Sequence, residues 1–195
     1  MVTSLPNLLT LSRIVVIPVM VALFYVDGST ARWAACALFV AAAITDWFDG
    51  YVARSRNQVS TFGRFLDPIA DKLLVVSVLF MLVAFNRVSE LSILSALVIV
   101  LREIMVSGLR EFLAEVRVGL PVSRLAKWKT GIQMVAIPVL LVGDALTILP
   151  TRQIGEAGLS VAAALTLVTG WDYLQSGLRH IRANPVPVDP ASPRD

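Results

Sequence analysis

Cysteine and histidine are nearly absent from this chain, which has one of each among its 195 residues. The single cysteine, Cys36, excludes a disulfide within the chain, and its place in an apolar run is typical of a small buried residue. The single histidine, His180, stands beside Arg179 near the end of the last apolar run, where we expect it at the membrane interface. These counts argue against a structural zinc site, which takes its ligands from Cys and His.

Charged residues are also scarce, and apolar residues are abundant instead. Asp, Glu, Lys and Arg make up 16% of the chain, whereas 56% of its residues are hydrophobic and its mean hydropathy is +0.75. A soluble domain has roughly 45–50% apolar residues, so the excess indicates a membrane protein. About 20 apolar residues cross the hydrocarbon core of a bilayer. We expect an all-α integral membrane protein with six transmembrane helices, at the apolar runs 8–26, 33–45, 73–85, 91–101, 132–149 and 154–173.

Four of these runs are short and continue into polar helical segments, at residues 46–54, 62–72, 102–110 and 127–130. The helices are thus expected to be apolar in one half and polar in the other. On one side of the membrane, the predicted loops carry only three basic residues, Arg32, Arg87 and Arg152. Because basic residues accumulate in cytoplasmic loops, both termini and the polar halves are predicted to face the cytoplasm.

Residues 1–183 are therefore interpreted as one membrane domain, which leaves no room for a separate soluble domain. The remaining residues, 184–195, are rich in proline and cannot pack a core. We expect them to form a disordered cytoplasmic tail.

Four aspartates near the joint between the second and third helices are the strongest candidates for function, because ionisable residues within spans are costly. Asp46 and Asp49 are three residues apart, and Asp67 and Asp71 are four apart, so each pair lies on one helix face. A short polar stretch joins the two helices, which we therefore expect to be antiparallel neighbours. The two acidic pairs should converge near the cytoplasmic end.

Carboxylates brought this close together repel one another unless a cation lies among them. Their oxygen atoms suit hard divalent ions, Mg²⁺ or Mn²⁺. Two such ions, about 3.5–4 Å apart, would hold a phosphoryl group during its transfer. We therefore expect a polar cavity, open to the cytoplasm, that contains two metal ions and binds a diphosphate. The simpler alternative is that the acids pair with basic neighbours at the membrane edge, namely Arg54, Arg56, Arg64 and Lys72.

Small and basic residues accompany the acids. Gly50, Ala53 and Gly63 remove side-chain bulk where helices meet or where a ligand approaches the backbone. Arg54 follows the first acidic pair, and its guanidinium group suits phosphate oxygens.

Residues 46–71 read DWFDGYVARSRNQVSTFGRFLDPIAD and match the pattern D-x2-D-G-x2-A-R-x8-G-x3-D-x3-D at every fixed position. This pattern resembles the signature of the CDP-alcohol phosphotransferase family, whose six-span architecture agrees with the count above. The resemblance implies that Asp46, Asp49 and Asp67 bind metal, and that Asp71 is the general base and contributes to the metal shell. It further implies that the nucleotide of the donor lies against Asp49, Gly50, Ala53, Arg54 and Gly63.

Two further stretches resemble the bacterial phosphatidylglycerophosphate synthases within that family. They are LPNLLTLSR at residues 5–13 and a set of residues between Arg102 and Met134, which departs from the expected pattern at Ala126, where glycine is expected. This resemblance implies CDP-diacylglycerol as the donor, sn-glycerol 3-phosphate as the acceptor and CMP as the leaving group. It also implies a homodimer in the inner or plasma membrane with its active site facing the cytoplasm.

Basic residues near the predicted metal site favour an anionic acceptor. Arg110, Lys127 and Lys129 lie at the predicted cytoplasmic ends of two helices and are the candidate ligands of its phosphate, although loop charges also arise from topology alone. Inositol phosphate, or phosphatidylglycerol as in cardiolipin synthesis, remains an alternative acceptor. A small cation transporter is a distant alternative, because the outer helix halves are almost wholly apolar. A nucleic-acid partner is not expected.

Overall fold

The structure of the protein is a computed structural model that describes residues 5–55, 61–115 and 124–183. Within these ranges, the side chains of residues 5–8, 47, 49–55, 61–65, 67, 68, 114, 115 and 180–183 are not described. The predicted tail, 184–195, lies outside the described residues, so its disorder remains a prediction.

Every regular element in the described ranges is a helix, which confirms the all-α prediction. The elements are α1 (Leu5–Phe24), α2 (Ser29–Ser55), α3 (Thr61–Ala84), α4 (Glu90–Glu115), α5 (Arg124–Val142), the short 3-10 helix η1 (Gly143–Ala145) and α6 (Thr151–Ala183). Helices α2, α3, α4 and α5 each join an apolar stretch to a polar one, as their sequences predict.

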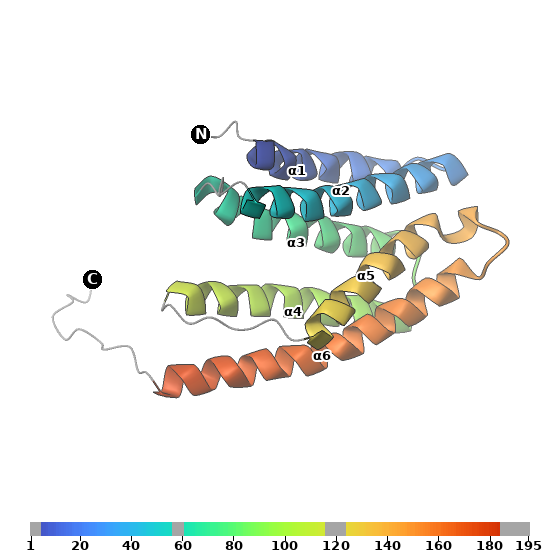
Figure 1. The fold of residues 1–195 in the computed structure, drawn as a ribbon. Coiled ribbons are helices and arrows are strands. Elements are labelled where there is room, and N and C mark those ends of the chain that lie inside the picture. Colours follow the sequence, from blue (N-terminus) through green and yellow to red (C-terminus); the bar gives the residue numbers. More distant parts are fainter. Residues whose placement is uncertain (1–4, 56–60, 116–123, 184–195) are drawn as a thin grey trace, which may run out of the picture.

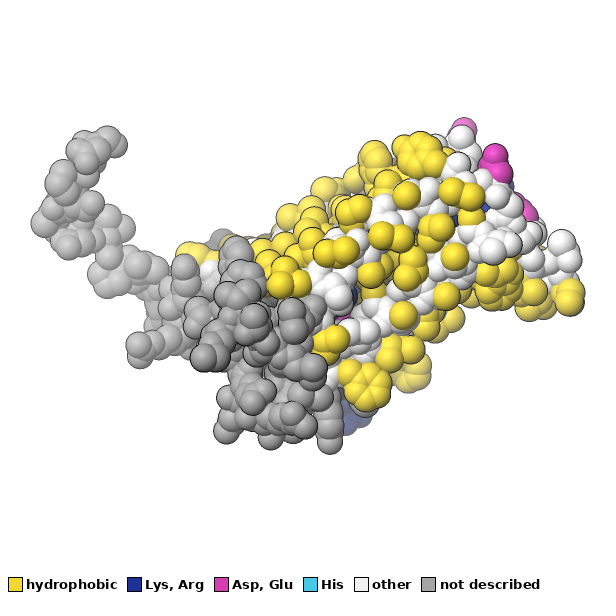
Figure 2. Space-filling model, turned by 90° about the horizontal axis from the view of Figure 1, so that it is seen from above, with side chains coloured by type: hydrophobic (Ala, Val, Ile, Leu, Met, Phe, Trp, Pro, Cys, Tyr) yellow, Lys and Arg dark blue, Asp and Glu magenta, His cyan; other side chains and the backbone are white. Residues whose placement is uncertain are grey.

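Three segments are long and apolar enough to cross a membrane, Glu90–Leu113, Arg124–Ala145 and Thr151–Arg179, and Leu9–Phe24 is a shorter apolar helix. Hydrophobic side chains also cover much of the face shown in Figure 2. Large apolar residues such as Phe80, Leu94 and Val135 are more than half exposed. A surface of this kind fits a membrane-embedded protein, while the count of six spans remains a prediction.

The helices pack in two groups that meet at α5 (Figure 1). In the first group α1 lies against both α2 and α3, and in the second α6 packs against α4 and α5. Direct contact between α2 and α3 is slight among the described residues, although their short joint predicts close neighbours. The buried side chains of Met20 and Phe24 on α1 join the core formed with α2 and α3, so α1 provides much of the packing between these two helices.

Backbone conformation explains where two of the helices end. Asn86 follows α3 with a φ of 53°, and the Arg87 amide donates to the Leu82 carbonyl, as in a left-handed helix cap. Gly143 follows α5 with a φ of 45°, and a Cβ there would lie 2.6 Å from Arg32 Nη1. The apolar run predicted to reach residue 149 therefore leaves the α-helix at Val142.

Candidate active site

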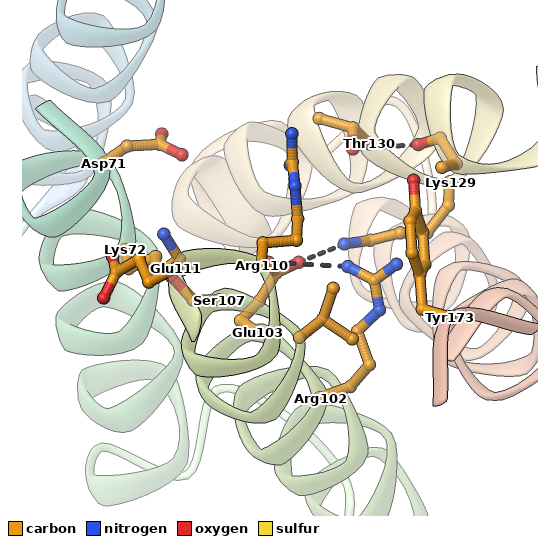
Figure 3. Close-up of a pocket in the computed structure, with 12 residues that line it drawn as sticks. Asp71, Lys72, Arg102, Glu103, Ser107, Arg110, Glu111, Lys129, Thr130 and Tyr173 are labelled. Atoms are coloured by element: carbon orange, nitrogen blue, oxygen red, sulfur yellow. Dashed lines mark hydrogen bonds and ion pairs between the residues drawn. The ribbon is translucent and has the colours of Figure 1, made fainter. Parts of the chain in front are cut away.

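A cavity of about 450 Å³ lies where α3, α4, α5 and α6 face one another (Figure 3). We call it the polar cavity. Its lining consists of Asp71, Lys72, Arg102, Glu103, Val106, Ser107, Arg110, Glu111, Ala126, Lys129, Thr130 and Tyr173. A smaller hollow of about 60 Å³ shares Asp71 and Glu103 with it and reaches the buried Gln133.

The spacing of residues on α4 explains how this helix contributes so much of the lining. Arg102, Val106 and Arg110 follow one another at intervals of four, and Glu103 and Ser107 stand next to them along the same side. This spacing gathers them on one face of the helix. Polar side chains on an otherwise apolar helix thereby meet α5 and α6 inside the protein, away from the apolar outer face.

An ion-pair network joins the helices around the polar cavity. Lys129 of α5 donates a hydrogen bond to Glu103 of α4, and Arg102 Nη1 lies 3.7 Å from Glu103 Oε2. Arg102 Nη2 also donates to Thr169 Oγ1 on α6 at 3.2 Å, and its guanidinium lies 5.6 Å from the centre of the Tyr173 ring. Arg102 and Glu103 thus form an ion pair inside the protein.

Asp71 stands on α3, across the cavity from these groups, and Figure 3 shows its carboxyl pointing toward the space between the helices. Asp46 of α2 and Glu103 both lie close enough to interact electrostatically with it. The structure therefore brings one acid from each predicted aspartate pair into the same region.

Asp46 has a buried cation beside it. Arg13 of α1 is 1% exposed and donates a hydrogen bond to Asp46, whose side chain is 43% exposed. The same guanidinium donates to Thr10 at 3.4 Å. In the sequence, Arg13 lies within the first predicted span, 8–26, and ends the stretch LPNLLTLSR. Its partner is 33 residues away, so no local pattern reveals the pair.

The other predicted residues of the aspartate motif lie on the same two helices, but their side chains are outside the described part of the structure. They are Asp49, Gly50, Ala53 and Arg54 on α2 and Gly63 and Asp67 on α3. Their predicted roles in binding metal and nucleotide therefore remain predictions.

The three basic residues predicted to bind the acceptor differ in their surroundings. Arg110 is exposed, lines the polar cavity and has no ion-pair or hydrogen-bond partner among the described residues. Lys129 lines the cavity too, but it is buried and bonded to Glu103. Lys127 is exposed and is not among the lining residues. The structure thus brings two of the three to the cavity, and Arg110 has the more available charge.

Sequence reasoning did not find Tyr173, which is 7% exposed and lines the cavity at the end of the last apolar run. A tyrosine in that position is equally typical of the membrane interface, so the sequence carries no separate signal for it. Gln133 lies in the stretch between Arg102 and Met134 that resembles the family, and its buried Oε1 has no hydrogen-bond partner among the described residues.

The chemistry of the predicted metal ligands fits a hard divalent cation. All four are aspartates, which offer only oxygen atoms. Among the described side chains no three acidic, His or Cys residues form a metal-ligand cluster, and Asp49 and Asp67 are outside that set. Asp46 accepts a hydrogen bond from the buried Arg13, so one of the four predicted ligands already has a cationic partner.

Comparison with known proteins identifies the family. The sequence profile of CDP-alcohol phosphatidyltransferases matches residues 3–170. The chain belongs to the CDP-alcohol phosphatidyltransferase family. This confirms the membership that the motif at residues 46–71 indicates, and the match extends over five of the six long helices and part of α6.

Several members of the CDP-alcohol phosphatidyltransferase family resemble this chain over most of its length. A protein of Rickettsia typhi is 51% identical over 174 residues, which cover 89% of this chain and 96% of the relative. A protein of Cereibacter sphaeroides is 39% identical, with 92% of this chain and 97% of the relative covered. One of Pseudomonas fluorescens is 40% identical, with 93% of each covered. All three are named CDP-diacylglycerol–glycerol-3-phosphate 3-phosphatidyltransferase.

Proposed function

We propose that this protein transfers a phosphatidyl group from CDP-diacylglycerol to sn-glycerol 3-phosphate and releases CMP. The names of the relatives support both substrates, and their similarity extends over nearly the whole chain. They give no support to inositol phosphate or phosphatidylglycerol as the acceptor, or to cation transport. The structural observation that carries the proposal is the polar cavity, in which the acid Asp71 and the basic Arg110 share one space.

Arg110 is the best-placed ligand for the phosphate of the acceptor. Its guanidinium lines the polar cavity and can form two parallel hydrogen bonds to phosphate oxygens. Lys129 adds positive charge nearby, although Glu103 neutralises much of it. Lys127, the third predicted ligand, lies outside the cavity lining, and its proposed role is to attract an anionic substrate toward the cavity mouth.

Asp71 is the proposed general base. It accepts the proton of the acceptor's 1-hydroxyl group as that oxygen attacks the phosphorus that carries the diacylglycerol. A new phosphorus–oxygen bond forms, the bond to the CMP phosphate breaks, and CMP leaves as an anion. The proximity of Asp71 to the basic side chains of the cavity lets one substrate reach both the base and the phosphate ligand.

The aspartates Asp46, Asp49, Asp67 and Asp71 would hold a divalent metal, Mg²⁺ or Mn²⁺, as the family resemblance implies. Two bound ions would neutralise the negative charge of the diphosphate. The proposed ligands of the donor nucleotide are Asp49, Gly50, Ala53, Arg54 and Gly63. Arg13 keeps Asp46 oriented toward this region through their hydrogen bond.

The proposed setting is the bacterial inner or plasma membrane. The protein would cross it six times as a single membrane domain, with both termini, the tail and the polar cavity on the cytoplasmic side. The distribution of Lys and Arg in the predicted loops supports this orientation. The family resemblance further suggests a homodimer, with the lipid donor entering from the bilayer and the phosphorylated acceptor from the cytoplasm.

The test is CMP release by purified protein in detergent, with CDP-diacylglycerol and Mg²⁺ or Mn²⁺. Glycerol 3-phosphate, inositol phosphate and phosphatidylglycerol are offered in parallel. We expect turnover with glycerol 3-phosphate alone, its loss on chelation of the metal, and its loss in Asp71→Asn. Asp172→Asn is the matched control, because Asp172 is exposed on α6 and does not line the cavity. Turnover with a different acceptor, or an active Asp71→Asn variant, would overturn the proposal.

A further inference from the structure

An apolar groove of about 250 Å³ lies between α4 and α6, beside the polar cavity. We call it the α4–α6 groove. Its lining from α4 consists of Val98, Leu101, Arg102 and Met105, and its lining from α6 consists of Thr166, Leu167, Gly170, Trp171 and Leu174. Both sets follow helical spacing, so two facing stripes form the walls.

The rim of the groove faces outward. Leu101, Leu167 and Trp171 are 58%, 59% and 61% exposed, and all three lie in segments apolar enough to cross a membrane. The lining spans eight residues of α4 (98–105) and nine of α6 (166–174), so at a rise of about 1.5 Å per residue the groove is about 10–12 Å long. One leaflet contributes roughly 15 Å of hydrocarbon, half of the bilayer core. The groove therefore has the surface and the length to hold most of a lipid chain, whose end would extend into the bilayer.

Two polar atoms at the floor of the groove lack the hydrogen bonds that buried groups normally form. Thr166 is fully buried, and its hydroxyl has no partner among the described residues. The Arg102 side chain is 10% exposed, and its Nε is likewise without a partner, although its Nη2 donates to Thr169 and its Nη1 lies 3.7 Å from Glu103. Both atoms are hydrogen-bond donors, so they would be satisfied by an oxygen atom at the end of an otherwise apolar ligand.

Arg102 belongs to both the polar cavity and the α4–α6 groove. Gly170 makes room for it, because a Cβ on Gly170 would lie 3.1 Å from Arg102 Cγ. A molecule with a phosphate head and an ester-linked chain could thus place its head in the cavity, its ester oxygen near Arg102 and its chain in the groove. A second apolar hollow between α2 and α5, lined by Phe39, Val40, Ala43, Ile44 and Met134, has no polar side chain in its wall.

We propose that the α4–α6 groove binds one acyl chain of the phosphatidyl lipid whose phosphate reaches the polar cavity at Asp71, while its nucleotide lies at the proposed site on α2 and α3. The ester oxygen of that chain accepts hydrogen bonds from Thr166 and Arg102, and the hydrocarbon lies against Leu101 and Leu167. This inference rests on the proposed function, since it names the position of the lipid in the same reaction.

The kinetic test compares Leu101→Trp, which adds bulk at the rim of the groove, with Ile104→Trp. Ile104 is 59% exposed on the same helix and outside the groove lining, so it is a matched control. With CDP-dioleoylglycerol we expect Leu101→Trp to raise KM about tenfold, the effect of losing about two buried methylenes. With a six-carbon-chain donor the change should stay within about twofold. Equal losses with both donors, or no loss with either, would overturn the proposal.

A binding test separates this proposal from the proposed function. CDP-diacylglycerol with a diazirine in one acyl chain is photolysed with the wild-type protein, and the labelled peptides are mapped. We expect labelling of α4 and α6 at the groove that excess CDP-dioleoylglycerol prevents and that Leu101→Trp loses. Labelling confined to the α2–α5 hollow, or labelling that the competitor does not reduce, would overturn the groove assignment. A wild-type protein that is labelled at the groove but releases no CMP would instead refute the proposed function.

Discussion

Lys129 of α5 donates a hydrogen bond to Glu103 of α4, and this pair ties the two helices together beside the polar cavity. The lysine side chain is 3% exposed and the glutamate 20%. Glu103 also lies 3.7 Å from a second cation, Arg102. Removing Lys129 would therefore leave Glu103 near Arg102, whereas removing Glu103 would take away the carboxylate to which Lys129 donates.

Glu103→Gln should destabilise the protein more than Lys129→Met. The first change leaves a buried ammonium group without its bonded carboxylate, which costs about 3–5 kcal/mol of unfolding free energy. The second leaves Glu103 with Arg102 as a partner, so we expect a smaller cost of about 1–2 kcal/mol. Thermal unfolding in detergent measures the order, and Glu111→Gln on the exposed part of α4 is the control. A lower midpoint for Lys129→Met would contradict the prediction.

Variants of Arg110 and Lys127 test whether the acceptor phosphate binds in the polar cavity, because the sequence predicts both residues as its ligands. Arg110 lines the polar cavity and Lys127 does not. A hydrogen bond to a charged group contributes about 1.5–3 kcal/mol, so Arg110→Gln should raise KM for glycerol 3-phosphate about 10–100-fold. Lys127→Gln should raise it less than about threefold at moderate salt, because an exposed charge is screened. Steady-state kinetics at varied acceptor concentration measure KM for both variants. Equal increases in KM would mean that the cavity does not bind the phosphate.

Removing Arg13 should make the stability of the protein depend more strongly on a divalent metal. Asp46 has the buried Arg13 guanidinium beside it, so Arg13→Met leaves the carboxylate without that charge. A bound cation would then compensate for part of the loss, and ligands that bind only the folded state stabilise it. We expect the midpoint of thermal unfolding to rise more on Mn²⁺ addition in Arg13→Met than in the wild type. Asp46→Asn combined with Arg13→Met should lose this extra response, and an equal rise in all variants would contradict the prediction.

The sequence predicts the helices well because hydropathy and residue spacing are local properties. The polar halves of α2 to α5 follow from ionisable residues at regular intervals, and the family motif follows from 26 consecutive residues, 46–71. The end of α5 at Val142 is different, because it depends on the positive φ of Gly143 and its approach to Arg32. The hydropathy pattern does not show where α5 ends, because the apolar run continues to residue 149.

The sequence does not predict contacts between residues that lie far apart along the chain. Arg13 meets Asp46 across 33 positions, and Arg102 meets Thr169 across 67. Each pair depends on how whole helices pack, not on spacing within one helix. The sequence offers candidate site residues where one motif contains them, but it does not reveal a residue such as Tyr173, which reaches the polar cavity only through the packing of four helices.

Close packing between α5 and α6 depends on small residues, and Gly155 is the sharpest case. A Cβ at Gly155 would lie 2.6 Å from Leu140 Cγ and 3.3 Å from the Ala136 carbonyl oxygen, so the helices would have to move apart. Gly155→Ala should therefore lower the unfolding free energy by about 1–3 kcal/mol, the usual cost of overpacking. Gly131→Ala is the matched control on α5, because nothing lies within 4 Å of a Cβ there. Alanine favours a helix over glycine by up to about 1 kcal/mol, so this control should be neutral or stabilising. If thermal unfolding in detergent gave both variants the same midpoint, the close approach of α6 to Leu140 would be wrong.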